Sequence, residues 1–228
     1  MSRQKFQAVS FDAAGTLIHL SEPVGISYSR VAARFKVETD PNAVSSAFKR
    51  VWKRTPLPFS GESEVKDATE KPWWRRLVKE VFEEVGAEFP HQECFDHFFE
   101  ALYDHFESPG TWVEDPDARA TLEKVSSNHR TVILSNFDHR LRRILRDLDL
   151  HHYFESIFLS CELGASKPDR RIFEAVSKAM DLPPHSIVHV GDDPKCDWKG
   201  AKEAGFHHFR VGKHQQPLCE LLRELSLA

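Results

Sequence analysis

Residues 8–17 read AVSFDAAGTL, where an apolar run carries the chain into Asp12 and then into a turn of small residues. The four residues Ala8–Phe11 are typical of a short buried strand. A strand that ends on a carboxylate and continues into alanine, glycine and threonine usually presents that carboxylate to a ligand. Ala14 stands two residues further on, where a second acid would be chemically useful. The stretch therefore predicts that Asp12 is functional and raises the question of what it attacks or binds.

The composition bounds the class of protein. The chain has 228 residues, a formal net charge of −4 and 40% hydrophobic residues, enough for one large domain or a core with a smaller domain attached. Its acidic balance argues against a nucleic-acid partner. No run of about 18 apolar residues would span a membrane, and the first residues lack the apolar segment of a signal peptide. The four cysteines form no C-x-x-C pair, so we expect a reduced, cytoplasmic protein.

Residues 21–107 show helical periodicity without any strand pattern, which predicts a helical subdomain. The helical segments are EPVGISYSRVAARF (22–35), DPNAVSSAFKRVWKR (40–54), KPWWRRLVKEVFEEVG (71–86) and HQECFDHFFEALYDHF (91–106), with a Pro/Gly/Ser-rich loop at 55–72. Asp40 is a candidate N-cap and Gly86 a candidate stop. We expect the aromatic residues to form mostly the subdomain's own core, namely Trp52, Trp73, Trp74, Phe95, Phe98, Phe99, Tyr103 and Phe106.

The rest of the chain alternates between strand and helix patterns. After residue 108, near-continuous apolar strands are predicted at RTVILS (130–135), FESIFLS (154–160), SIVHVG (186–191) and HHFRV (207–211). Helices are predicted at 115–127, 138–150, 167–182, 197–206 and 217–225. This alternation favours a parallel sheet covered by helices on both faces. We therefore predict an α/β protein with a three-layer α/β/α, Rossmann-like core formed by residues 1–20 and 108–228, with the helical segment 21–107 inserted after the first strand.

Polar side chains follow the predicted strands at the points where they end. The carboxyl ends of parallel strands share one edge of the sheet, and ligands bind there. A carboxylate, hydroxyls, a lysine and an acid pair on one edge are poorly explained as separate caps and turns. The residues are Asp12 and Thr16 after the first strand, Ser135 and Asn136 at the end of RTVILS, Lys167 in GASKPD, and Asp192 and Asp193 after SIVHVG, with Asp197 four residues beyond.

These residue types suit phosphoryl transfer. A carboxylate such as Asp12 can attack phosphorus or the carbon of an alkyl halide, forming an ester that water then hydrolyses. Lys167, the hydroxyls of Ser135 and Thr16, and the backbone N–H groups of the Ala13–Thr16 turn can offset charge on phosphate oxygens. A hard divalent cation such as Mg²⁺ would relieve the repulsion between Asp12 and an anionic phosphate.

Four motifs in this order resemble those of the haloacid dehalogenase (HAD) superfamily. They are FDAAGTL, ILSN, SKPD and VGDDPKCD, and the helical insertion resembles the cap of the subfamily with a small helical cap. The resemblance covers essentially the whole chain. The stretches FDAAGTL, SEPVG and WVEDPDA also resemble uncharacterised haloacid dehalogenase-like hydrolase domain-containing proteins.

The resemblance implies roles for individual residues. Mg²⁺ would bind the Asp12 carboxylate, the Ala14 backbone carbonyl and Asp192. Asp193 would act through water, and Asp197 would orient Lys167. The phosphate would be bound by Ala13, Gly15, Thr16, Ser135, Asn136 and Lys167. Taken on the residues alone, Asp193 and Asp197 have an alternative role as caps of a helix that begins near residue 195.

Ala14 departs from the phosphatases of this superfamily, which carry a second Asp at that position as general acid and base. Ala14 cannot move a proton, and the loss of such a group costs about 10²–10⁴ in rate. Four interpretations follow. The leaving group needs little protonation, the cap or the substrate supplies the acid, a different bond is cleaved, or the fold has lost catalysis and binds a partner.

Two branches of the superfamily also lack the second Asp. The 2-haloacid dehalogenases use no metal, so the acid pair Asp192 and Asp193 disfavours them, because uncompensated carboxylates would raise each other's pKa. Phosphonoacetaldehyde hydrolases share the pattern Asp-x-Ala-Gly-Thr and use Mg²⁺. They need a cap lysine for a Schiff base, and the candidates here are Lys36, Lys49 and Lys53.

The sequence as a whole predicts a Mg²⁺-dependent, HAD-like hydrolase. We expect a phosphatase that acts on a small phosphorylated metabolite through an aspartyl-phosphate intermediate on Asp12. The alternatives are a hydrolase similar to the phosphonoacetaldehyde hydrolases or the 2-haloacid dehalogenases, and a catalytically silent HAD fold that binds a partner or a metabolite. No pattern in the chain indicates its oligomeric state.

Overall fold

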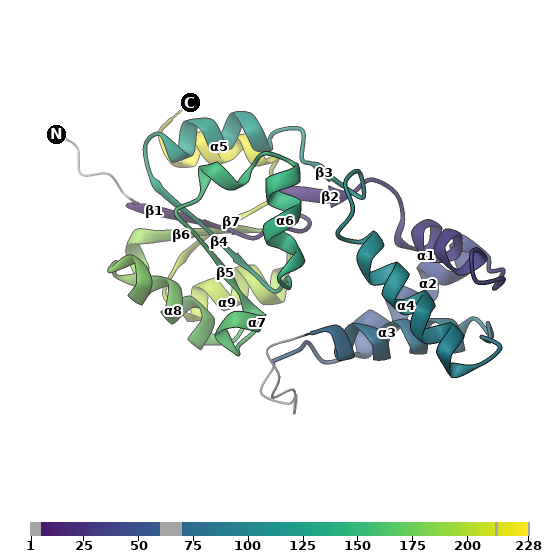
Figure 1. Ribbon diagram of the computed structural model, residues 1–228. Helices are drawn as coiled ribbons and strands as arrows, with labels where there is room; N and C mark the ends of the chain where they lie inside the picture. The colour runs from purple at the N-terminus through teal and green to yellow at the C-terminus, as the bar shows by residue number, and fades with distance from the viewer. Residues whose placement is uncertain (1–5, 60–69, 213, 228) are drawn as a thin grey trace. The chain divides into compact units, whose positions relative to one another are not determined.

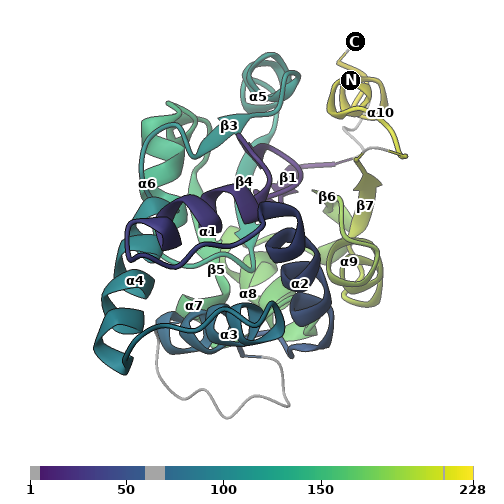
Figure 2. The same cartoon turned by 90° about the vertical axis from the view of Figure 1, so that its right-hand side faces the viewer.

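The computed structural model describes residues 6–59, 70–212 and 214–227, so most of the loop predicted at 55–72 lies outside the described residues. The chain forms two compact units (Figures 1 and 2). One contains Met1–His19 and Val113–Ala228 with a short stretch that begins at Pro58, and we call it the sheet unit. The other, the helical unit, contains Leu20–Leu57 and Thr69–Trp112. Within the described part of the chain, no helix has the length and apolar character needed to cross a membrane.

A five-stranded parallel sheet forms the centre of the sheet unit, in the order β5-β4-β1-β6-β7. Its strands are β1 (Ala8–Phe11), β4 (Arg130–Ser135), β5 (Ser156–Leu159), β6 (Ile187–Gly191) and β7 (His207–Arg210). β1 pairs with β4 on one side and β6 on the other, so Ala8 lies opposite both Arg130 and Ile187. All four residues of β1 are buried because the strand is central and covered on both faces. The predicted α/β, Rossmann-like fold is confirmed.

Helices cover both faces of the sheet (Figure 1). The helices α5 (Ala118–Ser126) and α6 (Arg140–Asp147) precede β4 and β5, the two strands on one side of β1. The helices α8 (Arg170–Met180) and α9 (Gly200–Glu203) lead to β6 and β7 on the other side of β1. Because such crossovers are right-handed, the two pairs lie on opposite faces. The direction of winding reverses between β1 and β6, and ligands of open α/β sheets bind at such a switch point.

Several predicted helices have different bounds in the structure. The helix predicted at 197–206 begins earlier, as the π-helical turn η3 (Pro194–Lys199), and continues as α9. It begins there because the Asp193 carboxylate accepts hydrogen bonds from the N–H groups of Lys195 and Cys196. The helix predicted at 217–225 is a 3₁₀ turn followed by one short helix. The short elements are η1 (His151–Tyr153), α7 (Ser160–Leu163), η2 (Pro184–Ser186), η4 (Leu218–Glu220) and α10 (Leu221–Glu224).

The helical unit contains helices close to the predicted segments. They are α1 (Val24–Ala33), α2 (Pro41–Arg54), α3 (Lys71–Glu84) and α4 (Gln92–His105). The predicted N-cap of α2 is confirmed, because the Asp40 carboxylate accepts hydrogen bonds from the two N–H groups that follow Pro41. Gly86 has a φ of 67°, the left-handed conformation that commonly ends a helix.

Aromatic side chains form much of the core of the helical unit, as the sequence predicts. Trp52 is the exception among the named residues, because 41% of it is exposed. Its ring stacks on those of Phe48 and Trp74 at centroid distances of 5.9 and 5.7 Å. The other named aromatic residues are buried or pack against that core, namely Trp73, Trp74, Phe95, Phe98, Phe99, Tyr103 and Phe106.

Two short strands that the sequence analysis did not predict lie where the chain passes between the units. They are β2 (Ile18–Leu20) and β3 (Trp112–Glu114), which pair as a two-stranded sheet. Strands of three residues are too short for an alternating pattern to be recognised. The Nε2 atom of His19 lies 2.9 Å from Oδ2 of Asp115, which ties the two linking segments together.

Candidate active site

The ends of β1 and β4 bring Asp12 and Ser135 together. Asp12 directly follows β1, and its N–H donates to the carbonyl of Val190 on β6 at 2.8 Å. Ser135, the last residue of β4, donates from Oγ to Asp12 Oδ1 at 3.0 Å. Both residues are buried. The nucleophile predicted from the sequence therefore lies at the switch point of the sheet, in contact with a predicted hydroxyl.

Lys167 lies between two buried carboxylates. Its Nζ donates to Asp12 Oδ1 at 2.8 Å and to Asp197 Oδ1 at 2.6 Å, and only 2% of its side chain is exposed. Burial alone would lower the pKa of Lys167, but attraction to Asp12 and Asp197 outweighs burial and raises that pKa. A buried ammonium that stays charged can counter the charge of a bound anion.

Asp197 is held by residues that the sequence analysis did not name. Burial would raise the pKa of Asp197, but Lys167 and His189 lower it below its ordinary range. The Nε2 atom of His189 lies 3.1 Å from Asp197 Oδ1, and its Nδ1 lies 3.0 Å from Ser10 Oγ. Ser10 and His189 are register partners on β1 and β6. Ser10 and His189 are polar residues within two otherwise apolar strands, and this pattern was the signal in the sequence from which their contact could have been predicted.

Asn136 holds Lys167 by its backbone. Its Oδ1 accepts a hydrogen bond from the Lys167 N–H at 2.7 Å, and its Nδ2 donates to the Lys167 carbonyl at 2.9 Å. This two-point contact fixes the segment around Lys167 against the end of β4. The side chain that the resemblance assigns to phosphate binding is thus engaged with the chain itself, and Asn136 positions Lys167.

Gly15 shapes the turn that follows Asp12. Its φ of 93° lies in the left-handed region, and a Cβ atom at this position would lie 2.6 Å from Oδ2 of Asp192. A larger residue would therefore displace the Asp192 carboxylate. The N–H of Gly15 donates to the Ile18 carbonyl, and the N–H of Thr16 donates to the Ala13 carbonyl. These two amides, expected from the sequence to face a phosphate, are engaged within the turn because they close it.

The Thr16 hydroxyl is buried in this turn without a hydrogen-bond partner among the described residues. Only 1% of Thr16 is exposed. Buried hydroxyl groups nearly always have a partner in native proteins, in the chain, in water or in a ligand. An unpaired hydroxyl close to Asp12 along the chain therefore fits a turn that contacts a bound group.

Three carboxylates gather at this edge of the sheet. Asp12, Asp192 and Asp197 each offer an oxygen atom within 4.8 Å of the others. Burial, together with the charges of Asp12 and Asp197, raises the pKa of Asp192 to about 7, and burial also raises the pKa of Asp12 against the effect of Lys167. Lys167 supplies one positive charge to three acids, so negative charge remains in excess. An excess of carboxylate oxygens fits a hard divalent cation such as Mg²⁺, which Asp12 and Asp192 would hold.

Asp193 and Ala14, unlike Asp12 and Asp192, do not belong to the cluster of three carboxylates. Asp193 is exposed, and its carboxylate caps η3, as the alternative interpretation of the sequence proposed. Asp197 combines both roles, because its Oδ2 accepts a hydrogen bond from the Asp193 N–H at 2.9 Å while its Oδ1 contacts Lys167. Ala14 is half-buried and carries no group that could move a proton.

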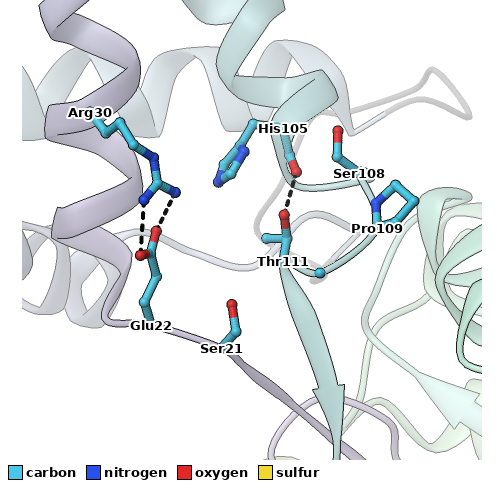
Figure 3. Close-up of a pocket in the computed structure, with 8 residues that line it drawn as sticks. Ser21, Glu22, Arg30, His105, Ser108, Pro109 and Thr111 are labelled. Atoms are coloured by element: carbon cyan, nitrogen blue, oxygen red, sulfur yellow. Dashed lines mark hydrogen bonds and ion pairs between the residues drawn. The ribbon is translucent and has the colours of Figure 1, made fainter.

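A separate hollow of about 330 Å³ lies within the helical unit (Figure 3). Both terminal nitrogens of Arg30 donate to the Glu22 carboxylate, so the guanidinium is already neutralised and offers little attraction for a phosphate. The hydroxyl of Thr111 donates to the carbonyl of His105 at 2.8 Å. The full lining is Ser21, Glu22, Arg30, His105, Ser108, Pro109, Gly110 and Thr111, and none of these residues was predicted as functional.

The fold and the site together define an α/β protein with a buried aspartate–lysine centre at the switch point of its sheet. The profile of the family described as haloacid dehalogenase-like hydrolase matches residues 6–205. The chain is 31% identical over 210 residues to haloacid dehalogenase-like hydrolase domain-containing protein 3 of Bos taurus, a match that covers 92% of this chain and 83% of that protein. The chain therefore belongs to the haloacid dehalogenase-like hydrolase family.

Solved structures with a similar fold include a protein named as a phosphatase and a protein named as a dehalogenase. The HAD phosphatase from Thermococcus onnurineus matches with a TM-score of 0.67 and 20% identity, covering 96% of this chain and 98% of that one. The L-2-haloacid dehalogenase from Xanthobacter autotrophicus matches with a TM-score of 0.70 and 19% identity, covering 98% of this chain and 84% of that one. At these identities the likeness concerns the fold alone, so the choice of reaction depends on the site.

Proposed function

We propose that the protein is a magnesium-dependent phosphatase that hydrolyses a small phosphorylated metabolite through an aspartyl-phosphate intermediate on Asp12. The observation that carries this proposal is the distribution of charge. Lys167 pairs with Asp12 and Asp197, whereas no ion pair to Asp192 occurs in the described part of the chain. The pKa of Asp192 is raised to about 7 by burial and by the charges of Asp12 and Asp197. Bound Mg²⁺ would supply the positive charge that lets a carboxylate approach an anionic phosphate.

The residues of the site can be assigned steps. An oxygen of Asp12 attacks phosphorus, and the bond from phosphorus to the leaving oxygen breaks, so the leaving group departs with that electron pair. Water then attacks the acyl phosphate, which releases inorganic phosphate and restores the carboxylate. Ser135 and Lys167 hold Asp12 Oδ1 beforehand and would donate to phosphoryl oxygens as their charge grows. Asp197 and Asn136 keep Lys167 in place for that role.

Ala14 narrows the class of substrate. An alkoxide leaves poorly without a proton, and Ala14 cannot supply one. We therefore propose that the preferred substrates have leaving groups that are stable as anions, such as aryl or acyl phosphates. An acid from the substrate or from the helical unit is the alternative source of the proton.

The competing reactions account for fewer of these features. Attack on a carbon–halogen bond involves no anionic phosphate, so it gives the carboxylate of Asp192 beside Asp12 no purpose. A Schiff-base mechanism needs an amine whose pKa is lowered by burial or by a neighbouring cation. The three candidate lysines, Lys36, Lys49 and Lys53, are all exposed. Neither rival is favoured by a specific contact in the structure.

The test measures inorganic phosphate released from a panel of aryl, acyl and alkyl phosphates, with and without Mg²⁺. We expect release that depends on Mg²⁺ in the wild type and none from the matched variant Asp12→Asn. Chloride release from 2-chloropropionate without Mg²⁺ would instead assign a dehalogenase. Equal rates in the wild type and in Asp12→Asn would contradict any mechanism that uses this carboxylate.

A further inference from the structure

We propose that Asp149, His151 and His152 form a second cation site, for a zinc-class divalent ion, that shares no residue with the acidic cluster at Asp12. The three residues lie in the turn between α6 and β5, with both histidines in η1. Each offers one ligand atom, and these atoms all lie within 4.8 Å of one another. Imidazole nitrogen and carboxylate oxygen are donors that zinc accepts, whereas Mg²⁺ takes oxygen ligands almost alone.

The spacing of two of the ligands already suits zinc. Asp149 Oδ1 lies 3.4 Å from His152 Nδ1. Two ligands bound at about 2.0–2.1 Å in a tetrahedral site lie about 3.3–3.4 Å apart, which follows from the bond length and the tetrahedral angle. The ring of His151 is nearly perpendicular to that of His152, at 88°, so the two rings do not stack on each other. The ligand nitrogen of His151 lies no more than 4.8 Å from the other two ligand atoms, and a rotamer change of this exposed side chain can bring it closer.

The backbone beneath the three ligands is fixed. Leu150, which separates Asp149 from the histidines, is fully buried, and its N–H donates to the carbonyl of Leu145 at 2.8 Å. The Asp149 N–H donates to the carbonyl of Arg146 at 2.9 Å, and the Tyr153 N–H to that of Leu150 at 3.2 Å. A turn ordered before binding reduces the entropy lost when its side chains take hold of an ion. The ligand side chains are exposed, so the ion has access and water can complete its coordination.

The site and the acidic cluster lie at opposite edges of the sheet. Asp12 follows the carboxyl end of β1, whereas the turn at 149–152 leads into the amino end of β5, which is parallel to β1 through β4. The amino ends of parallel strands share the edge away from the carboxyl ends. An ion at Asp149 therefore uses no residue of the candidate active site, and the two sites can be titrated separately.

The alternative is an ordinary surface ion pair between Asp149 and His152, in which His151 has no part. The test is calorimetric titration of the untagged full chain with Zn²⁺ in the presence of excess Mg²⁺. We expect one Zn²⁺ per chain, and its binding should be lost in His151→Ala/His152→Ala. The single variants His151→Ala and Asp149→Asn should each weaken it by roughly tenfold or more, since even outer-shell partners of metal ligands contribute that much.

Two controls locate the ion. The variant His185→Ala/His214→Ala removes two exposed histidines outside the proposed site and should leave zinc binding unchanged. Asp192→Asn should also leave it unchanged, and Co²⁺ should give a visible absorption band that disappears in the 151/152 double variant. Unchanged affinity in that double variant, or in His151→Ala alone, would overturn the three-ligand site. Loss of binding in Asp192→Asn would instead assign the ion to the acidic cluster. Circular dichroism confirms that each variant is folded.

Discussion

Replacing Lys167 by methionine removes the cation on which the candidate active site is built. The Lys167 side chain is 2% exposed, and its ammonium donates to both Asp12 and Asp197. Methionine keeps much of the length and apolar volume of lysine, but it leaves two buried carboxylates without their shared partner. Removing one member of a buried ion pair costs about 3–5 kcal/mol. We expect the free energy of unfolding of the sheet unit to fall by about that amount at pH 7.

The loss of stability should depend on pH in a definite direction. Lys167 lowers the pKa of Asp197 in the folded protein, so this pairing contributes stability above the unfolded pKa of about 3.9 and loses it as pH falls through the folded value. The folded pKa of Lys167 is raised, so its contribution is complete below its unfolded pKa of about 10.4 and is lost as pH rises through the folded value. The difference in the free energy of unfolding between the wild type and Lys167→Met should therefore be largest from about pH 5 to 10 and should decrease in acid.

Hydrogen exchange of the β1 amides measures this difference within the sheet unit, because β1 is the central strand and opens with that unit. A chelator must be present, since a divalent cation could replace the missing ammonium. The control Lys167→Met/Asp197→Asn removes one of the two orphaned charges and should recover part of the loss. A loss below about 1 kcal/mol, the value of an exposed pair, would refute the reasoning. A loss of free energy of unfolding that stays constant as the pH falls into the acid range would also refute the reasoning.

Three further substitutions test the proposed mechanism. Asp12→Asn should abolish phosphate release while leaving the circular dichroism spectrum and melting temperature close to those of the wild type, and turnover at the wild-type rate would exclude an intermediate on Asp12. Gly15→Ala places a methyl group 2.6 Å from the Asp192 carboxylate, in a backbone region that costs about 1–2 kcal/mol, and should raise the Mg²⁺ concentration needed for half-maximal rate. An unchanged Mg²⁺ dependence would speak against Asp192 as a ligand. Ala14→Asp should raise the ratio of alkyl to aryl phosphate rates by up to about 10²–10⁴, and an unchanged ratio in a folded variant would mean that no proton donor is missing at position 14.

The central sheet was predictable because its strands are apolar along their whole length. β4 has the predicted bounds 130–135, and β6 begins one residue after the predicted start. β2 and β3 were missed because three residues carry too little periodicity to distinguish a strand from a loop. The helix around Asp197 begins earlier than predicted, because a carboxylate cap at Asp193 and a proline after it set its start.

The site was predictable as a set of residues and unpredictable as a set of contacts. The rule that parallel strands end at one edge explains why Asp12, Ser135 and Lys167 meet although they are far apart in the chain. It does not say which donor meets which acceptor, because that choice depends on side-chain direction over distances near 3 Å. Asn136 shows the limit, since it follows Ser135 directly and yet bonds the backbone of Lys167. His189 gave a weak signal because a histidine within an apolar strand is more often a packed core residue.

Ala14 and Asp192 constrain the reaction from two sides. In the proposed mechanism no side chain protonates the leaving group, because Ala14 stands at the position of the acid. The leaving group then departs as a stable anion, a condition that halides, aryl phosphates and acyl phosphates all meet. The acidic cluster separates these classes, because the carbon of an alkyl halide carries no anionic oxygens, whereas a phosphate repels the Asp12 carboxylate. Lys167 pairs with Asp197, whereas Asp192 has no ion pair among the described residues, and burial together with the charges of Asp12 and Asp197 raises the pKa of Asp192 to about 7. We therefore propose a phosphate with a good leaving group as the substrate class, because it accounts both for Ala14 and for the carboxylate of Asp192.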